Sequence, residues 1–149
     1  MKALIVYDSV YGNTEKIARA VAEAITPSGE VKVLGVGEAN PSELASTDLL
    51  IVCSPTHAGR PTPAVQALLN KVPKLQGINV AAFDTRSQSK LVKVFGNAAG
   101  RIARNLKGKG GNLIASPEGF LVTGTKGPLK EGEMERAAAW AKGILESKK

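Results

Sequence analysis

The chain has 149 residues, is 43% hydrophobic and 22% charged, and carries a formal net charge of +7. This length fits a single domain over residues 1–149, and the composition is that of an ordinary globular protein. No apolar run approaches the roughly 20 residues that a membrane helix needs, and the N-terminus lacks a signal-peptide pattern, so we expect a cytoplasmic protein. A single cysteine, Cys53, excludes an internal disulfide bond and a cysteine-based zinc or iron–sulfur site, and we expect no metal.

The first half of the chain alternates between strand and helix patterns. In chain order these predict a strand at residues 2–7, a helix capped by Asn13 or Thr14 and ended by Pro27-Ser28-Gly29, an edge strand at 31–36, a short helix at 41–44, and a strand at 49–53. The first and third strands are near-continuous apolar runs. Such runs are typical of strands buried on both faces of a parallel sheet.

The second half continues the alternation. It predicts a helix opened by Pro61 or Pro63, a strand at 78–83, a long helix at about 89–107, a strand split at Ser116-Pro117 into 113–115 and 119–122, and a helix at about 131–147. The long helix has an apolar stripe that includes Leu91 and Phe95. Strands and helices in this order predict one parallel sheet with helices on both faces, which binds ligands at the carboxyl ends of its strands.

The polar loop Ser9-Val10-Tyr11-Gly12-Asn13-Thr14 joins the first strand to the first helix. The first amides of a helix have no partner within it, and the helix dipole favours an anion there. Two hydroxyls and one side-chain amide add donors, and Gly12 lets the backbone approach closely. Because no Lys or Arg lies within residues 8–15, we expect a phosphate monoester held by neutral donors. A helix cap that binds no ligand is the alternative.

Other phosphate-binding patterns do not fit this chain. The dinucleotide pattern G-x-G-x-x-G does not follow the first strand, and the P-loop pattern is absent. Response regulators share the architecture but need an Asp at the end of the third strand, where this chain has Cys53-Ser54. Cys53 and Arg60 follow the wrong strand for a phosphatase loop. We therefore expect Cys53 to be a small core residue.

The stretch from Ile5 to Val21 resembles the flavodoxin signature at its constrained positions. The matching anchors are Ser9, Gly12, Thr14, Ala18 and Val21. Its Tyr-Gly-Asn-Thr-Glu-Lys segment is especially similar to the flavodoxin domains of flavo-diiron proteins and to quinone-reductase relatives. The resemblance implies an α/β three-layer sandwich with a five-stranded parallel sheet of order 2-1-3-4-5. It also implies flavin mononucleotide (FMN) bound where the strand order reverses, as is known for this fold.

The resemblance further implies how the site is divided. The flavin phosphate lies on residues 9–14, and the ring lies between a second loop at 55–60 and a third at 84–88. The implied cofactor-binding residues of these two loops are Pro55, Thr56, His57, Ala58, Gly59, Asp84, Thr85 and Arg86. Since the flavin itself moves the electrons and the protein tunes it, no catalytic side chain is expected.

The second and third loops contain no Trp, Tyr or Phe, although flavodoxins usually stack the flavin ring against aromatic side chains there. His57 and Tyr11 are the available substitutes. By analogy with base stacking, each missing contact weakens ring binding by about 1–3 kcal/mol. The sequence therefore predicts weaker binding of FMN.

Positive charge is concentrated in the second half of the chain. Residues 1–84 carry a net charge of −1 and residues 85–149 a net charge of +8. A positive helix face suits an acidic redox partner such as a ferredoxin, and a merely solvated face is the alternative. The residues expected on this face are Lys90, Lys93, Arg101, Arg104, Lys107 and Lys109. Aromatic residues are not interleaved with these charges, which argues against nucleic acid, and no membrane partner is expected.

The sequence thus predicts an FMN-binding electron carrier, and two alternatives stay open. The first is an NAD(P)H-dependent quinone or flavin reductase, which needs room above the ring for a nicotinamide. Ala58 and Gly59 are small enough to leave that room. The second is a binding module that kept the fold and lost the flavin.

Overall fold

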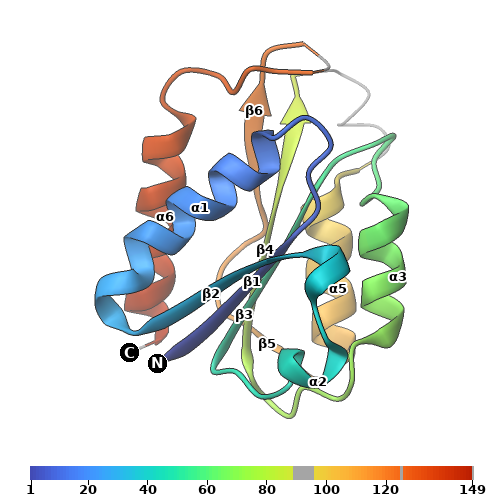
Figure 1. The fold of residues 1–149 in the computed structure, drawn as a ribbon, viewed down its shortest axis with the longest axis vertical. Coiled ribbons are helices and arrows are strands. Elements are labelled where there is room, and N and C mark those ends of the chain that lie inside the picture. The colour runs from blue at the N-terminus through green and yellow to red at the C-terminus, as the bar shows by residue number, and fades with distance from the viewer. Residues whose placement is uncertain (89–95, 125, 149) are drawn as a thin grey trace.

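The computed structural model describes residues 1–88, 96–124 and 126–148 of the chain (Figure 1). Its strands are β1 (Lys2–Tyr7), β2 (Glu30–Gly35), β3 (Leu49–Pro55), β4 (Asn79–Ser87), β5 (Asn112–Leu113) and β6 (Glu118–Val122). Its longer helices are α1 (Asn13–Ile25), α3 (Pro63–Lys71), α5 (Ala98–Gly108) and α6 (Glu133–Lys148). A short helix, α2 (Pro41–Leu44), and 3-10 turns at Thr26–Ser28 and Val36–Glu38 complete the described elements.

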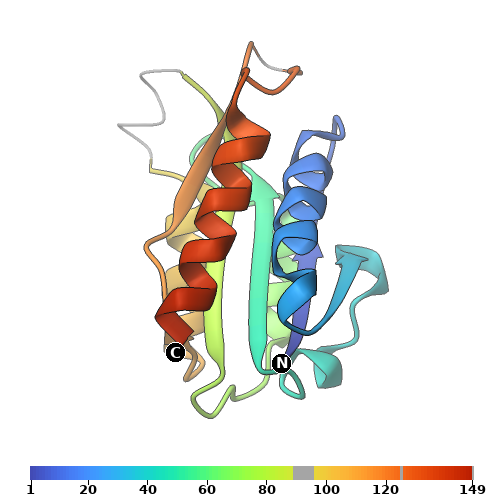
Figure 2. The ribbon, with the colours of Figure 1, turned by 90° about the vertical axis from the view of Figure 1, so that its left-hand side faces the viewer.

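The strands form one parallel sheet of order β2-β1-β3-β4-β5, with β6 also paired to β4. Helices α1 and α6 cover one face of this sheet, and α3 and α5 cover the other (Figures 1 and 2). The predicted three-layer α/β sandwich of order 2-1-3-4-5 is therefore confirmed.

The apolar side chains of β3 explain its position in the middle of the sheet. Every residue from Leu49 to Ser54 of β3 is buried, so this strand has helices against both of its faces. At the edge, β2 is partly exposed along its length, as its alternating pattern predicts. Cys53 is fully buried in β3, and burial raises the pKa of its thiol well above the ordinary range. It is the inert core residue that we expected.

The outermost position of the sheet is shared by two short strands, as the split apolar pattern predicts. Asn112–Leu113 pairs with the start of β4, and Glu118–Val122 pairs with its end at Phe83–Ser87. This second pairing extends β4 beyond its predicted end at residue 83. Asp84, Thr85 and Arg86, which we expected in a loop, are therefore strand residues, and their side chains alternate between the two sides of β4.

Two predictions about helices are wrong for a stereochemical reason. Gly12, with φ of 89°, is the N-cap of α1, and neither Asn13 nor Thr14 caps this helix through its side chain. The helix predicted over 89–107 does not run through Gly96 and Asn97, because Gly96 has a φ of 84° and Asn97 is extended. Helix α5 begins only at Ala98, capped by the Asn97 side chain, which accepts from the Gly100 amide at 2.7 Å. Leu91 and Phe95 lie outside the described residues.

A buried carboxylate fixes helix α6 to strand β6. Glu133 accepts the Leu121 amide at 2.7 Å and pairs with Arg136 at 2.7 Å. The Arg136 guanidinium also pairs with Glu118 and lies 4.6 Å from the centre of the Phe120 ring. The partly buried Trp140 packs edge-on against Phe120 and Phe83 and so extends the core on this side of the sheet.

Replacing Glu133 with Gln should lower the free energy of unfolding by about 1–3 kcal/mol at neutral pH, because the partly exposed Arg136 and the Leu121 amide lose their charged acceptor. The hydrogen bond from Arg136 lowers the pKa of Glu133 below its ordinary value of 4.5. Its stabilising contribution is therefore present above that value and is lost as the pH falls through the lower pKa of the folded state.

Urea unfolding of the wild type and of Glu133→Gln measures this contribution. The difference between the two proteins should be large at neutral pH and should shrink in acid. Glu131→Gln is the matched control, since Glu131 is exposed just before α6 and makes no ion pair in the described part of the chain. An equal loss in both variants would contradict the role of Glu133.

Candidate functional site

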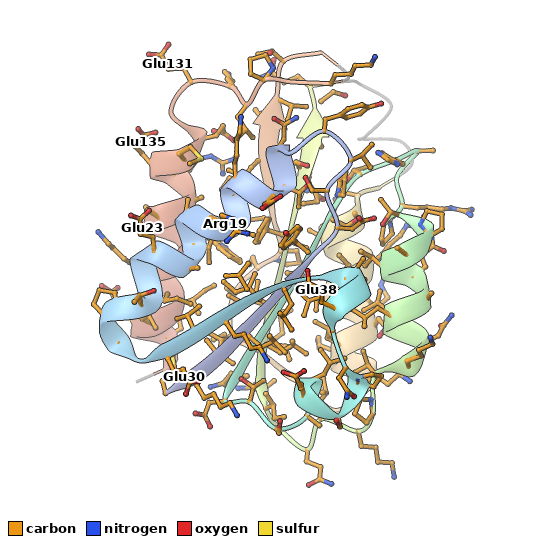
Figure 3. All side chains as sticks on the ribbon, in the orientation of Figure 1. Arg19, Glu23, Glu30, Glu38, Glu131 and Glu135 are labelled. Carbon is orange, nitrogen blue, oxygen red and sulfur yellow. The ribbon has the colours of Figure 1, made fainter. Side chains whose placement is uncertain are left out.

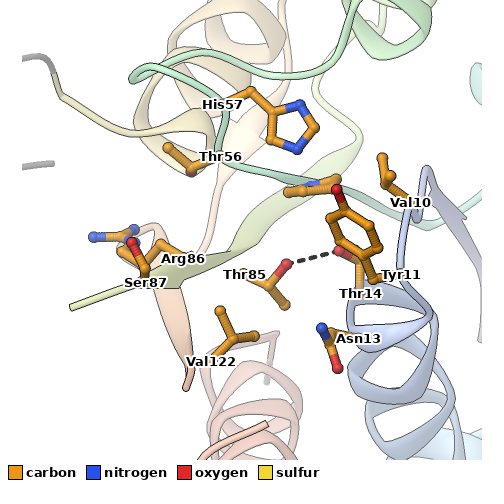
Figure 4. Close-up of a pocket in the computed structure, with 11 residues that line it drawn as sticks. Val10, Tyr11, Asn13, Thr14, Thr56, His57, Thr85, Arg86, Ser87 and Val122 are labelled. Carbon is orange, nitrogen blue, oxygen red and sulfur yellow. Dashed lines mark hydrogen bonds between the residues drawn. The ribbon is translucent and has the colours of Figure 1, made fainter. Parts of the chain in front are cut away.

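Strands β1, β3 and β4 end at the same edge of the sheet, and a pocket opens there. Its lining comes from the loop after β1, the ends of β3 and β4, and β6. In Figure 4, Asn13 and Thr14 lie at the start of α1 and Thr14 points toward Thr85, while Tyr11, in the loop before α1, points toward the side of the pocket where His57 lies. This is the edge of a parallel α/β sheet at which ligands bind.

Unsatisfied backbone donors lie at the start of α1. Within the described part of the chain, the backbone amides of residues 10–14 donate to no protein acceptor. The amide of Glu15 is the first to be satisfied, since it donates to the Ser9 hydroxyl oxygen at 3.3 Å. The hydroxyl proton of Ser9 stays available for a ligand. Together with the helix dipole, these groups form a site for an anion.

A hydroxyl pair joins the first loop to the end of β4. The Thr14 and Thr85 oxygens are 2.8 Å apart, and both side chains are buried (Figure 4). In such a pair one hydroxyl donates to the other, so a single proton remains to be donated elsewhere. Thr14 and Thr85 therefore act together, and one of them can serve a ligand in the pocket.

The Asp8 carboxylate fixes the base of the first loop to helix α3. It accepts from the Ser9 amide at 3.0 Å and from the hydroxyl of Thr62, the N-cap residue of α3. The Thr62 amide in turn donates to the Ser54 hydroxyl at 3.0 Å. Asp8 is thus occupied in holding two loops together, which leaves the anion site without a facing carboxylate from this residue.

The second loop is a tight turn that presents His57. The backbones of His57 and Arg60 pair with each other, while Ala58 and Gly59 lie at the turn with positive φ. Thr56 links the loop to its neighbours, because its amide donates to the Thr85 carbonyl at 2.9 Å and its hydroxyl accepts from the Ala98 amide at 3.0 Å. His57 is exposed and lines the pocket.

The end of β4 contributes Arg86, whose guanidinium group is held in place by Asp84. Asp84 is fully buried and accepts from Arg86 at 2.7 and 2.8 Å and from the Ala99 amide at 2.9 Å. Arg86 also packs onto Gly119, where a Cβ atom would lie 2.2 Å from its guanidinium carbon. Arg86 lines the pocket, whereas Asp84 lies behind it.

The predicted site residues thus divide into two groups. Those that line the pocket are Val10, Tyr11, Asn13, Thr14, Pro55, Thr56, His57, Thr85 and Arg86. Those that shape it from behind are Ser9, Gly12, Ala58, Gly59 and Asp84. Val122, which sequence reasoning missed, also lines the pocket, as does Ser87, which lies in the predicted third loop but was not named as a binding residue. Val122 reaches the pocket through its pairing with Ser87 in the register of β4 and β6, which no local pattern reveals.

The family model described as Flavodoxin matches residues 5–140 of this chain. The chain belongs to the flavodoxin family. Flavodoxins bind FMN and transfer electrons, so the prediction of an FMN-binding electron-transfer protein is confirmed. Comparison with curated proteins gave no match.

Solved structures of flavodoxins have the same fold. Oxidised Flavodoxin 2 from Bacillus cereus matches with a TM-score of 0.84 at 23% identity, over 98% of this chain and 99% of that one. Oxidised Flavodoxin 1 from the same organism gives 0.85 at 18% identity, over 98% of each chain. The rubredoxin:oxygen oxidoreductase of Desulfovibrio gigas gives 0.78 at 27% identity, over 98% of this chain but 35% of that one.

The pocket of this flavodoxin fits FMN in its chemistry. Free amides and hydroxyls suit the phosphate, and the lining also offers the apolar Val10, Pro55 and Val122 to a ring. Tyr11 and Val10 keep 50% and 51% of their surface exposed, which is unusual for such side chains and leaves them free to contact a ligand. In the described residues no helix has the length and hydrophobicity to cross a membrane, and no side chains cluster as a metal site would require.

Replacing Gly12 with Ala should weaken FMN binding without unfolding this flavodoxin. A Cβ atom at Gly12 would meet nothing within 4 Å, so the change brings no clash. The φ of 89° is nevertheless strained for any L side chain, at about 1–2 kcal/mol. The loop should therefore relax away from the geometry that aims its amides, and the Kd for FMN should rise about tenfold.

Flavin fluorescence titration measures this Kd, and Gly37→Ala is the matched control. Gly37 also has free space for a Cβ atom, lies in a turn that does not line the pocket and has no positive φ. Unchanged FMN affinity in Gly12→Ala would show that the conformation of this loop does not matter for the cofactor.

Proposed function

We propose that this flavodoxin holds the FMN phosphate on residues 9–14 and the flavin ring between residues 55–59 and 84–86. One observation carries the proposal: the amides of residues 10–14 have no acceptor in the described part of the chain, at the start of a helix that faces the pocket. An anionic group satisfies these donors and the helix dipole together.

The residues around the pocket have distinct roles in this proposal. The Ser9 hydroxyl and the shared proton of Thr14 and Thr85 donate to phosphate oxygens. Val10 and Tyr11 cover the cofactor and exclude water. Arg86, held by Asp84, keeps a positive charge beside the pocket. When bound, FMN supplies the redox chemistry, because its ring system accepts and releases electrons.

The hydroxyl pair gives a sharp test of the phosphate position. Thr14→Val and Thr85→Val should each raise the Kd for FMN about tenfold, because a hydrogen bond to a charged group contributes about 1.5–3 kcal/mol. The double variant should bind no more weakly than the weaker single variant, since the pair offers only one proton.

Thr26→Val is the control for this test, because Thr26 lies at the opposite end of α1 and its hydroxyl bonds to Ala22 and to no other group among the described residues. Titration with riboflavin, which lacks the phosphate, should show little change in any variant. Equal weakening of FMN and riboflavin would place the phosphate elsewhere.

We also propose that this flavodoxin exchanges electrons with an acidic redox protein through its α3–α5 side. The chain from Arg60 to Phe83 contains no acidic residue, and neither does α5. The exposed cations of the described part of this side include Lys71, Lys74, Arg104 and Lys107. By contrast, Glu23, Glu131 and Glu135 are among the acidic side chains on the α1–α6 side (Figure 3).

The basic side adjoins the cofactor pocket. A hollow between α3 and α5 is lined by Arg60 and Arg101, and the Arg101 Nε donates to the Gly59 carbonyl at 2.9 Å. The second loop therefore belongs both to this side and to the FMN site. A partner attracted by these charges reaches the pocket edge, which supports short-range electron transfer. Lys90 and Lys93, which we also expected here, lie outside the described residues.

Charge reversal tests the docking proposal. Arg104→Glu should slow electron exchange with an acidic plant-type ferredoxin by about fivefold at low salt, because it weakens electrostatic steering. The rate of the wild type should fall as salt rises, and that of the variant should fall less. Stopped-flow absorbance of the flavin follows the exchange.

Lys142→Glu, an equal charge change on exposed α6, is the matched control and should leave this rate nearly unchanged. Equal slowing by both variants would show that only net charge matters. Faster exchange of the wild type with a basic cytochrome than with the ferredoxin would contradict an acidic partner.

A further inference from the structure

The connection between β6 and α6 lies against the phosphate loop, although more than a hundred residues separate them in the sequence (Figure 1). The Asn13 side-chain nitrogen donates to the Lys126 carbonyl at 3.1 Å. Thr123 closes the connection on itself, with its amide and its hydroxyl donating to the Pro128 carbonyl at 2.8 and 3.0 Å. These bonds fix Lys126 beside the start of α1.

Gly127 permits this close approach. Its φ is 96°, and a Cβ atom there would lie 2.5 to 3.0 Å from the side-chain atoms of Asn13. A larger residue would push the connection away from the loop. The contact between Asn13 and residues 126–127 is therefore a specific fit and depends on glycine.

Lys126 carries its charge toward the loop. Its ammonium nitrogen lies 5.9 Å from the centre of the Tyr11 ring, and Tyr11 lines the pocket. The loop itself has no cation, since no Lys or Arg occurs in residues 8–15. Of its two carboxylates, Asp8 is bonded to Thr62 and Glu15 to Arg19. Lys126 thus brings a positive charge to a loop that lacks one.

We propose that Lys126 is a phosphate-positioning residue, whose ammonium group attracts the FMN phosphate to residues 9–14 and makes this flavodoxin discriminate against flavins without a phosphate. The inference rests on the phosphate position proposed above. A phosphate monoester carries nearly two negative charges at neutral pH, and neutral donors balance none of that charge. Asn13 contributes to both contacts, because one of its amide protons bonds to the Lys126 carbonyl and the other, which has no acceptor among the described residues, can donate to the phosphate.

Removing the charge tests the proposal directly. Lys126→Gln should raise the Kd for FMN about tenfold at low salt and the Kd for riboflavin less than twofold, since only FMN carries the phosphate charge. The effect on FMN should shrink at high salt. Lys126→Arg should retain most of the wild-type affinity. Lys142→Gln, a matched loss of charge on exposed α6, should change neither Kd.

Gly127→Ala gives a second test that leaves the lysine in place. By displacing the connection from Asn13, it should weaken FMN binding and leave riboflavin binding nearly unchanged. Thermal unfolding of each variant without flavin checks that the fold is intact. The double variant Gly127→Ala with Lys126→Gln should have nearly the same Kd for FMN as Lys126→Gln alone, because both changes remove the same interaction.

The outcomes separate this inference from the proposed cofactor position. If Thr14→Val weakens FMN selectively but Lys126→Gln does not, the phosphate lies on the loop and Lys126 has no part in holding it. Equal weakening of FMN and riboflavin by Lys126→Gln would show that the residue acts through Tyr11 and the ring, which also overturns the inference. If neither Thr14→Val nor Lys126→Gln changes the Kd for FMN, both the position and the inference fail.

Discussion

The site of this flavodoxin depends on the backbone donors that open helix α1 and find no acceptor among the described residues. A helix of 13 residues packed on the sheet by Ile17, Val21 and Ile25 cannot turn away to satisfy them. The surrounding polar groups are arranged around this constraint. Asp8 holds the base of the loop, and the Thr14–Thr85 pair closes it against β4, while both leave the amides accessible. An anionic cofactor therefore completes the protein's own hydrogen bonding.

Much of the fold could be predicted from the sequence, because its signals are local. The apolar runs of β1 and β3 require burial on both faces, and the split pattern at Ser116-Pro117 predicts the divided fifth position of the sheet. The first loop was also predictable, since a strand, a polar loop and a helix follow one another directly. The first residues of the helices were harder to predict. A glycine at position 96 indicated a break in the predicted long helix, but the apolar residues on both sides of it keep a helical spacing, which favoured one continuous helix.

The parts of the site that were not predicted depend on contacts between distant segments. Nothing near Asp84 indicates that its carboxylate accepts the amide of Ala99, at the start of α5. The bond from Asn13 to Lys126 joins residues that no periodicity relates. Val122 reaches the pocket because β6 pairs with the end of β4. Such placements follow from strand register, which sequence patterns leave open at a polar strand end.

The bonds that Glu133 and Arg136 of α6 make to β6 have a consequence for how this protein behaves at high concentration. An outer strand with unpaired backbone groups invites a strand from another molecule, and aggregation begins at such edges. Here the outward amide of Leu121 bonds to Glu133, its carbonyl accepts from Lys130, and the Gly119 carbonyl accepts from Arg136. The side chains and backbone at the start of α6 thus occupy the positions that an incoming strand would need. Protonation of Glu133 in acid would therefore weaken the bonds to Leu121 and Arg136 together, and with them part of the protection of this sheet edge against self-association.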